Sequence, residues 1–315
     1  MKYVLITPAR NEAASIELTI QSVVKQTARP LRWVIVSDGS TDGTDDIVRK
    51  YTTSHDWIEL LRMPERKERH FGGKVLCFNA GYSSIVGRHP PLCFDIIGNL
   101  DADMSFEGDV FAFLMNKFAE NHKLGVAGVP FNEGSGTYDF RFSSVEHVSG
   151  ACQLFRRECF EAISGYTPLK GGGIDVVAVL TARMKGWQTR TFHEKVCLHH
   201  RTMGTASHGG TKASFKLGVK DYTLGRHPVW QLFRGLYQTT RPPLIMGGVL
   251  LLAGYFWAMM KRTERPLPEE LVQFQRREQM QRLKEFLTRK LLFFRQPAKC
   301  ASSSEFERTT ADKVG

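Results

Sequence analysis

Residues 97–106 read IGNLDADMSF, and this stretch links the predicted fold to a predicted chemistry. An apolar run that ends at Leu100 is followed by two carboxylates, Asp101 and Asp103. Side chains alternate along a strand, so residues i and i+2 lie on the same side. Paired carboxylates at a strand end can hold a hard cation such as Mg²⁺ or Mn²⁺, with water and phosphate oxygens as further ligands. The stretch predicts such a site, and an ordinary turn or helix cap is the structural alternative.

The segments around this stretch alternate between short apolar runs and helical periodicity. This alternation predicts an α/β sandwich around a mainly parallel sheet. Ligands of such sheets bind beyond the carboxyl ends of the strands. Three polar loops are expected at that edge: Thr7–Glu12, Asp38–Gly43 and Asp101–Asp103. The expected strands are residues 3–7, 31–36, 58–62 and 94–100, and the expected helices are 11–27, 44–53, a helix after Gly73, and 176–186.

The α/β domain is expected to occupy residues 1–213, and the rest of the chain has a different character. Residues 214–243 are predicted to form amphipathic interfacial helices. Residues 244–260 carry no charge and lie at the short end of the roughly 17–25 residues that span a bilayer. They predict a transmembrane or re-entrant helix, with a buried core helix as the alternative. Residues 261–315 are predicted to be a basic amphipathic helix and a disordered tail.

The net charge of +11 is concentrated toward the C-terminus. Residues 241–315 hold 14 of the 43 Lys and Arg but 8 of the 32 Asp and Glu. A basic segment beside an apolar one indicates an anionic membrane surface as partner. Nucleic acid is disfavoured, because zinc-finger spacing, an RNA-binding aromatic motif and a helix-turn-helix are not found.

Two features indicate a cytosolic location. The apolar run Tyr3–Ile6 is too short for the core of a signal peptide. The six cysteines show no CxxC pairing, so reduced and mostly buried thiols are expected.

Glycine-rich motifs supply further candidate side chains. In SDGSTDGT, Asp38 follows a strand and can accept a hydrogen bond from a nucleobase; a strand-to-helix turn is the alternative. In HFGGKVLCFNAG, Lys74 can neutralise a diphosphate, although GxxxxGK[ST] is absent and a solvated lysine is the alternative. Asp175 begins a helix behind three glycines and can deprotonate a hydroxyl group or simply cap the helix.

Adjacent histidines stand in CLHHRTMG. Consecutive residues on a strand face opposite sides, so at most one of His199 and His200 is expected to join the acid pair. A metal or phosphate contact and a structural or surface role both remain open for them.

Taken in order, these motifs resemble family 2 glycosyltransferases with the GT-A fold, over residues 2–203. The resemblance is to enzymes of bacterial envelope and exopolysaccharide assembly. The matching blocks are ITPARNE (6–12), SDGSTDGT (37–44, with Ser37 in place of an Asp), GGKVLCFNAG (72–81), Asp101-Ala102-Asp103, and GACQLFRRECFEAISGY (150–166).

The resemblance implies roles at the matching positions. Asp175 would occupy the family's catalytic base position, although Ile174 replaces the usual Glu, and Ala178 and Thr181 replace the usual Leu and Arg. Asp103, with Asp101, would bind Mg²⁺ or Mn²⁺ on the donor diphosphate. The other implied donor contacts are Pro8, Glu12 and Asp38 around the base and ribose, and Lys74 and Asp101 on the donor.

The implied reaction is inverting transfer of a sugar from a nucleotide-diphospho-sugar to a hydroxyl group. The Gln-x-x-Arg-Trp signature of processive synthases is missing, so one transfer per encounter is expected. The expected acceptor is a polyprenyl-linked glycan at the cytoplasmic face of the inner membrane. Two alternatives are a non-catalytic membrane scaffold with the same fold and a sugar nucleotidyltransferase, although ITPARNE lacks the glycine- and basic-rich phosphate loop usual in the latter.

Overall fold

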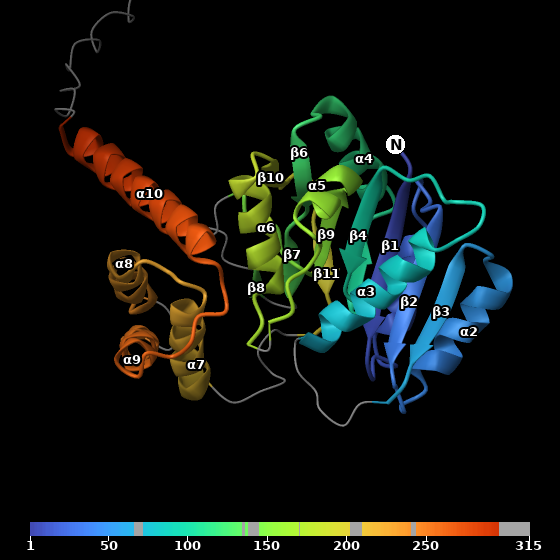
Figure 1. Ribbon diagram of the computed structural model, residues 1–315, viewed down its shortest axis with the longest axis horizontal. Helices are drawn as coiled ribbons and strands as arrows, with labels where there is room; N and C mark the ends of the chain where they lie inside the picture. The colour runs from blue at the N-terminus through green and yellow to red at the C-terminus, as the bar shows by residue number, and fades with distance from the viewer. Residues whose placement is uncertain are drawn as a thin grey trace, which may run out of the picture.

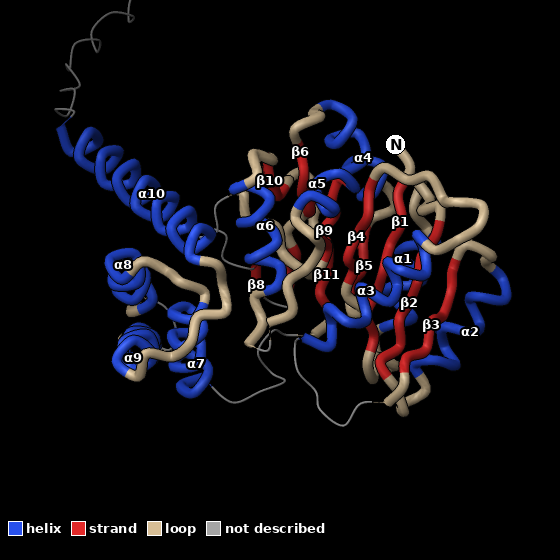
Figure 2. Tube along the Cα trace, viewed as in Figure 1, coloured by secondary structure: helices blue, strands red, loops and turns tan. Residues whose placement is uncertain are grey.

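The computed structural model describes residues 1–65, 72–133, 136–137, 145–169, 171–201, 210–240 and 244–295. Their main feature is a seven-stranded sheet (Figures 1 and 2). Its pairings are parallel except at β9, which runs antiparallel to both its neighbours, β4 and β6. The predicted mainly parallel sheet is therefore confirmed. The strand order is β10 (Gln188–Thr191), β6 (Leu124–Gly128), β9 (Cys152–Arg156), β4 (Ile96–Leu100), β1 (Tyr3–Ala9), β2 (Arg32–Asp38) and β3 (Ile58–Met63).

Helices cover both faces of this sheet, as the predicted sandwich requires. Alternate side chains of one strand enter the two opposite cores: Ile96 and Leu100 of β4 pack on one face, and Ile97 on the other. Helices α1 (Ile16–Val24), α2 (Thr44–Ser54) and α4 (Val110–Glu120) contribute to the first core. Helices α3 (Gly72–Val86), α5 (Arg157–Ala162) and α6 (Ile174–Met184) contribute to the second.

The first helix is shorter than the predicted 11–27. Asn11 adopts a left-handed conformation with φ 55°, which an α-helix excludes. A turn follows, in which the carbonyl of Glu12 accepts hydrogen bonds from the backbone N–H groups of Ser15 and Ile16. The helix starts only at Ile16, and the preceding turn places Glu12 at the sheet edge.

A second, small sheet lies beside the acid pair. It consists of β5 (Met104–Phe106), β11 (Cys197–His199), β7 (Phe131–Glu133) and β8 (Gly136–Thr137). Strand β11 is antiparallel to β5 and parallel to β7, and its His199 is in register with Met104 and Glu133. This pairing brings a late segment of the chain next to Asp103.

In the described part of the chain, four helices follow the sheets: α7 (Gly210–Thr223), α8 (Pro228–Gln238), α9 (Met246–Met260) and α10 (Glu269–Arg295). Helices α7 and α9 touch backbone to backbone, because a Cβ at Gly218 would lie 2.0 Å from the carbonyl oxygen of Leu251. A Cβ at Gly254 would likewise lie 2.1 Å from the carbonyl oxygen of Phe215. Helix α10 joins the α/β part through an ion pair of 2.9 Å between Arg183 and Glu278.

Within the described residues, no helix is both long enough and apolar enough to cross a bilayer. The transmembrane prediction for residues 244–260 is therefore not supported. Their helix, α9, has 15 residues, and its glycines draw one side against α7 and α8 while large apolar side chains on another side stay exposed. The predicted disordered tail lies mostly outside the described residues.

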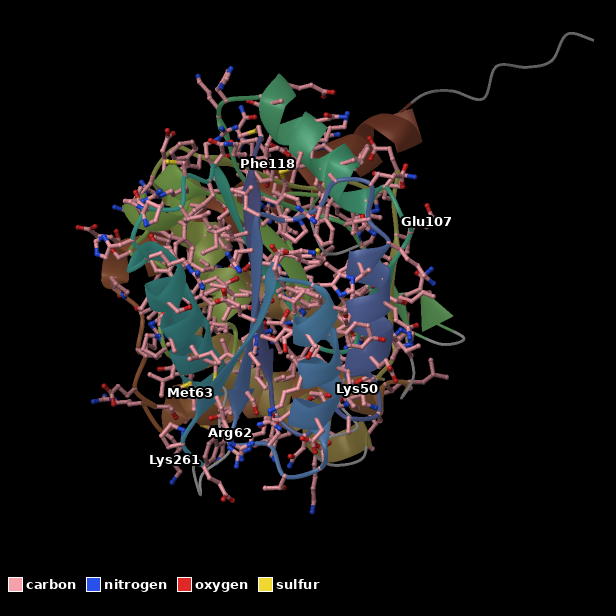
Figure 3. The ribbon with its side chains drawn as sticks, turned by 90° about the vertical axis from the view of Figure 1, so that its right-hand side faces the viewer. Lys50, Arg62, Met63, Glu107, Phe118 and Lys261 are labelled. Carbon is pink, nitrogen blue, oxygen red and sulfur yellow. The ribbon has the colours of Figure 1, made fainter. Side chains whose placement is uncertain are left out.

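The carboxyl edge of the sheet and the end of α9 lie toward the same end of the molecule. Figure 3 shows Arg62 and Met63, at the end of β3, and Lys261, directly after α9, in the lower part of the view, with Phe118 of α4 in the upper part. Figure 1 shows α7 and α9 at the corresponding level. In Figure 1 these helices lie to one side of the sheet, beyond α6.

The cysteine prediction agrees with the described cysteines, which are all free thiols. Cys77, Cys152, Cys159 and Cys197 are buried, whereas Cys93 is exposed.

Candidate functional site

The three polar loops meet at the carboxyl edge of the sheet, as predicted. Strands β1, β2 and β4 are neighbours and run parallel, so the residues that follow them lie at one edge. Asp38 ends β2, Glu12 follows β1, and Asp101 and Asp103 follow β4. In Figure 1 this edge is at the lower end of the sheet.

Lys74 and Asp101 form an ion pair at this edge. Lys74 is in the first turn of α3, and its ammonium group donates a hydrogen bond to the Asp101 carboxylate. It also lies 3.4 Å from the carbonyl oxygen of Gly150. Burial raises the pKa of Asp101 above its usual value, against the opposing effect of the Lys74 charge. The structure thus brings together two residues predicted separately, 27 positions apart.

Asp103 is held by His199. The Nε2 atom of His199 lies 3.3 Å from Oδ2 of Asp103, and its Nδ1 lies 3.0 Å from Oε1 of Glu133. Burial alone would raise the pKa of Asp103, but the hydrogen bond and charge of His199 lower it below its usual value. Burial would lower the pKa of His199, but hydrogen bonds to the two carboxylates raise it. The imidazole is therefore stabilised in its charged form.

The two histidines take different sides, as the strand pattern predicted. The ring of His200 is exposed and lies 2.9 Å from the hydroxyl of Ser105, whereas its backbone N–H donates to the Asp103 carbonyl at 2.8 Å. Only His199 joins the acid pair.

The residues expected around the nucleotide also lie at this edge. The buried Glu12 carboxylate forms a two-pronged ion pair with Arg201, at 3.1 and 2.6 Å. Asp38 is buried and lies 3.5 Å from the guanidinium of Arg10. Pro8 is a partly exposed residue of β1, in register with Val36 of β2.

Asp175 lies in the first turn of α6, after Gly173, which adopts a left-handed φ of 89°. Its Oδ2 accepts a hydrogen bond of 3.2 Å from the backbone N–H of Gly150. Gly150 therefore links two predicted site residues: its N–H donates to Asp175 and its carbonyl faces Lys74.

The donor set at this edge suits a hard divalent cation. The oxygens of Asp101 and Asp103 are the ligands that Mg²⁺ and Mn²⁺ prefer. The structure contains no group of three or more His, Cys, Asp or Glu residues that could hold a metal by itself, as far as its described residues go. Two carboxylates completed by diphosphate oxygens fit this arrangement, and each is now held by a basic side chain, Lys74 or His199.

Several residues of the site were not predicted from the sequence. Glu133 and Arg201 reach it only through the pairing of β11 and the turn that follows, and no local motif marks either. Arg10 was inside a quoted motif without being singled out. Asn99 had a usable signal, because a polar residue interrupts an otherwise apolar strand.

Comparison with known proteins places the chain in a family. Residues 4–167 match the family described as Glycosyl transferase family 2, and the chain belongs to that family. The predicted family resemblance is thereby confirmed.

Individual relatives are distant. The poly-beta-1,6-N-acetyl-D-glucosamine synthase of Staphylococcus epidermidis is 23% identical over 268 residues, covering 80% of this chain and 55% of that protein. The synthase of the same name from Staphylococcus aureus (strain COL) is 25% identical over 140 residues, covering 44% and 31%. The chain thus spans about half the length, or less, of these curated relatives.

Solved structures show the same fold. A mannosyltransferase, PcManGT from Pyrobaculum calidifontis in complex with GDP-Man and Mn²⁺, aligns with a TM-score of 0.54 and 18% identity, covering 94% of this chain and 81% of that one. S. aureus TarS 1–349 in complex with UDP-GlcNAc aligns with a TM-score of 0.52 and 14% identity, covering 84% and 74%. The fold is therefore GT-A-like, with a mostly parallel central sheet.

Proposed function

We propose that this chain transfers a sugar from a nucleotide-diphospho-sugar to a hydroxyl acceptor, in a non-processive reaction that inverts the anomeric centre. The supporting observation is Gly150, whose carbonyl oxygen faces Lys74 of the Lys74–Asp101 pair and whose N–H donates to Asp175. A group that can neutralise a leaving diphosphate and a group that can accept a proton are then both hydrogen-bonded to one residue, Gly150. Membership of the glycosyl transferase family supports the same chemistry.

The side chains at this edge of the sheet have different roles in the proposed reaction. Lys74 and Asp101 contact the donor, while Pro8, Glu12 and Asp38 surround its base and ribose. Asp175 accepts the proton of the acceptor hydroxyl. The oxygen of the acceptor hydroxyl forms a bond to the anomeric carbon on the face opposite the diphosphate. The bond between the anomeric carbon and the diphosphate oxygen breaks.

Asp101 and Asp103 would hold Mg²⁺ or Mn²⁺ when the donor is bound. The cation would offset the negative charge that the diphosphate gains as it leaves. Lys74 pairs with Asp101 and His199 pairs with Asp103, so basic side chains offset the negative charge of both carboxylates. Holding the two substrates in reactive orientation supplies much of the expected acceleration.

A panel of UDP- and GDP-sugars tests this proposal. The full-length protein is incubated with each donor, Mg²⁺ or Mn²⁺, and a membrane lipid extract as acceptor, and nucleoside diphosphate release is measured. Release that requires the extract supports transfer. Formation of a nucleotide-sugar from sugar phosphate and nucleoside triphosphate would instead identify a nucleotidyltransferase. Neither product, together with no metal-dependent nucleotide binding, would favour the scaffold alternative.

We also propose that the chain works on a lipid-linked glycan at the cytoplasmic face of the inner membrane. The supporting observation is an exposed apolar stripe along α9, spaced as i, i+3, i+7, i+11 and i+14. It consists of Met246, Val249, Ala253, Trp257 and Met260, and Met260 is 75% exposed. Leu244 and Ile245, which precede the helix, are exposed as well.

The charge around this stripe favours an anionic lipid surface. Asp221 is the single acidic residue of residues 210–262, and it is buried and paired with Arg226 and Arg234. Lys261 and Arg262, directly after the stripe, are exposed. Two copies of so basic a surface would repel each other, whereas a lipid bilayer with acidic headgroups would attract it.

Vesicle flotation tests the membrane proposal. Val249→Glu combined with Trp257→Glu should abolish flotation of the full chain with anionic vesicles, and Leu18→Glu, at an exposed apolar position of α1, should leave it intact. Failure of the wild-type chain to float would contradict the proposal. Loss of dimers in the double variant would instead identify a second copy as the occupant of the stripe.

A further inference from the structure

Two buried amides stand side by side in the middle of the sheet. Asn99 of β4 and Gln153 of β9 are register partners, and they are 1% and 0% exposed. Apolar residues surround them: Ile97 and Phe155, on the same two strands, belong to the core of that face. Burying an amide costs roughly 1–3 kcal/mol unless it is hydrogen-bonded, so the contacts of this pair indicate what it does.

Both amides bind the segment that leads to Gly150. Asn99 donates from Nδ2 to the carbonyl oxygen of Gly150. Gln153 donates from Nε2 to the carbonyl oxygen of Val148 at 2.8 Å. The hydroxyl of Tyr166 donates to Oε1 of Gln153 at 2.6 Å, which fixes the orientation of that amide. Residues 148–150 are thus held to the sheet at two carbonyl oxygens.

The same pair reaches Asp175 by two routes. Gln153 Nε2 lies 3.5 Å from the backbone carbonyl oxygen of Asp175. Gly150, held by Asn99, donates its N–H to the Asp175 carboxylate at 3.2 Å. Gln153 therefore contacts the backbone of Asp175, and Asn99 fixes the carbonyl group of Gly150, the residue whose N–H binds the Asp175 side chain.

We propose that Asn99 and Gln153 are positioning residues that set the orientation of the Asp175 carboxylate through Gly150. This inference rests on the proposed role of Asp175 as the proton acceptor. The carbonyl oxygen of the same residue, Gly150, lies 3.4 Å from the Lys74 ammonium group. By holding Gly150, Asn99 and Gln153 also fix the spacing between the donor side and the acceptor side of the site.

Stability alone does not account for Asn99. Its Oδ1 atom is buried without a hydrogen-bond partner among the residues that the structure describes. An unsatisfied buried acceptor is costly, and an apolar residue of the same size would avoid that cost. The hydrogen bond to Gly150 is the contact that an apolar residue cannot make.

Variants of similar shape test the inference. Asn99→Leu and Gln153→Met keep the volume and remove the hydrogen bonds. A misplacement of about 1 Å can cost about 100-fold in rate. We expect kcat for transfer to fall by about 10–100-fold in each variant, while the Kd for UDP or GDP in Mn²⁺ changes by less than about twofold.

A buried amide elsewhere provides the matched control. Gln26 donates to the carbonyl oxygen of Ser22 at 3.1 Å and accepts from the backbone N–H of Phe111 at 3.1 Å, in the layer on the opposite face of the sheet. Gln26→Leu reports what the loss of a buried amide does to folding and, through it, to activity. It should lower the Tm without separating kcat from nucleotide affinity.

Three outcomes are distinguishable. A selective loss of kcat in Asn99→Leu and Gln153→Met supports the inference. Unchanged kcat in folded variants, or a parallel loss of kcat and nucleotide affinity, overturns it while leaving the proposed function intact. Near wild-type transfer by Asp175→Asn would overturn the proposed base itself, and the inference with it.

Discussion

The Nε2 atom of His199 lies 3.3 Å from Oδ2 of Asp103, and this contact joins the end of β11 to the turn before β5, almost a hundred residues earlier in the chain. Side chains of both residues are about one-tenth exposed. Because both side chains are largely buried, the contact contributes to the stability of the folded protein. Its contribution depends on pH, because both His199 and Asp103 gain or lose a proton as the pH changes.

The pKa of His199 is raised from an ordinary value of 6.5. The stability that charged His199 contributes is therefore complete below pH 6.5 and is lost as the pH rises through the raised pKa. The pKa of Asp103 is lowered from 3.8, so its effect is present above that pH and is lost as pH falls through the lowered value. We therefore expect His199→Gln to lower the Tm most between about pH 4 and 6.5, by about 2–4 °C for each kcal/mol lost.

Thermal unfolding in EDTA from pH 4 to pH 9 checks this prediction. His122→Gln, at an exposed histidine, is the control and should follow the wild type throughout. If the Tm difference between His199→Gln and the wild type stays constant over the whole range, the stability that this ion pair contributes does not depend on pH, and the prediction is wrong.

Asp103→Ala should weaken metal-dependent nucleotide binding. It removes one of two carboxylates expected on the cation, and we expect the affinity for UDP or GDP in Mn²⁺ to fall at least about tenfold. Isothermal titration calorimetry with and without Mn²⁺ measures the loss. Asp46→Ala, on the outer face of α2, removes an exposed carboxylate and should have no effect. Equal affinities for wild type and Asp103→Ala would remove Asp103 from the metal site.

Asp175→Asn should separate chemistry from binding. The amide keeps the size of the side chain but cannot accept the proton, so transfer should fall by roughly 10²–10⁴-fold. Nucleotide affinity should stay within about twofold of the wild type. Rates of nucleoside diphosphate release and calorimetry on the same sample supply both values.

Gly150→Ala should displace Asp175 by crowding its side chain. A Cβ at Gly150 would lie 2.9 Å from the Cβ of Asp175, closer than side-chain carbons normally approach. Asp175 must move, and we expect kcat to fall by about 100-fold with the fold retained. Gly171→Ala is the matched control, since its Cβ would meet nothing within 4 Å. Full activity of a folded Gly150→Ala protein would show that Asp175 tolerates displacement.

Gly218→Ala should separate α7 from α9. Its Cβ would lie 2.0 Å from the carbonyl oxygen of Leu251, and the backbone there cannot yield as a flexible side chain would. We expect a loss of about 1–3 kcal/mol, seen as a lower Tm in circular dichroism. The apolar stripe of α9 would lose its support, so vesicle flotation should weaken as well. A Tm equal to that of Gly171→Ala would contradict this account of the helix contact.

Local patterns predicted the sandwich because the signals that decide it lie within short windows. Apolar runs of strand length alternate with helical periods, and parallel strands then put the loops after β1, β2 and β4 at one edge. The DxD pair, Lys74 and Asp175 were each identified from a motif of a few residues. The topology placed Asp101 and Asp103 at the sheet edge, whereas Lys74 and Asp175 were assigned to the site from their motifs and the family resemblance.

The C-terminal part was predicted less well because hydropathy does not reveal what covers an apolar helix. Residues 244–260 have the composition of a short membrane span, but within the structure α9 packs through its glycines on α7 and α8. The contact depends on small residues spaced along three separate helices. Only their arrangement in space shows which face is covered.

The sequence by itself determined the α/β sandwich, the family and the acidic edge of the sheet, because periodicity and motif spacing are local properties. The tertiary structure decided which partner each acid has. Asp103 meets His199, which also contacts Glu133, through the pairing of β11. Glu12 meets Arg201, and Asp175 is held by Gly150, which belongs to a segment anchored by two buried amides. These contacts join residues that are distant in the chain, and strand register and packing, rather than any local pattern, bring them within hydrogen-bond distance.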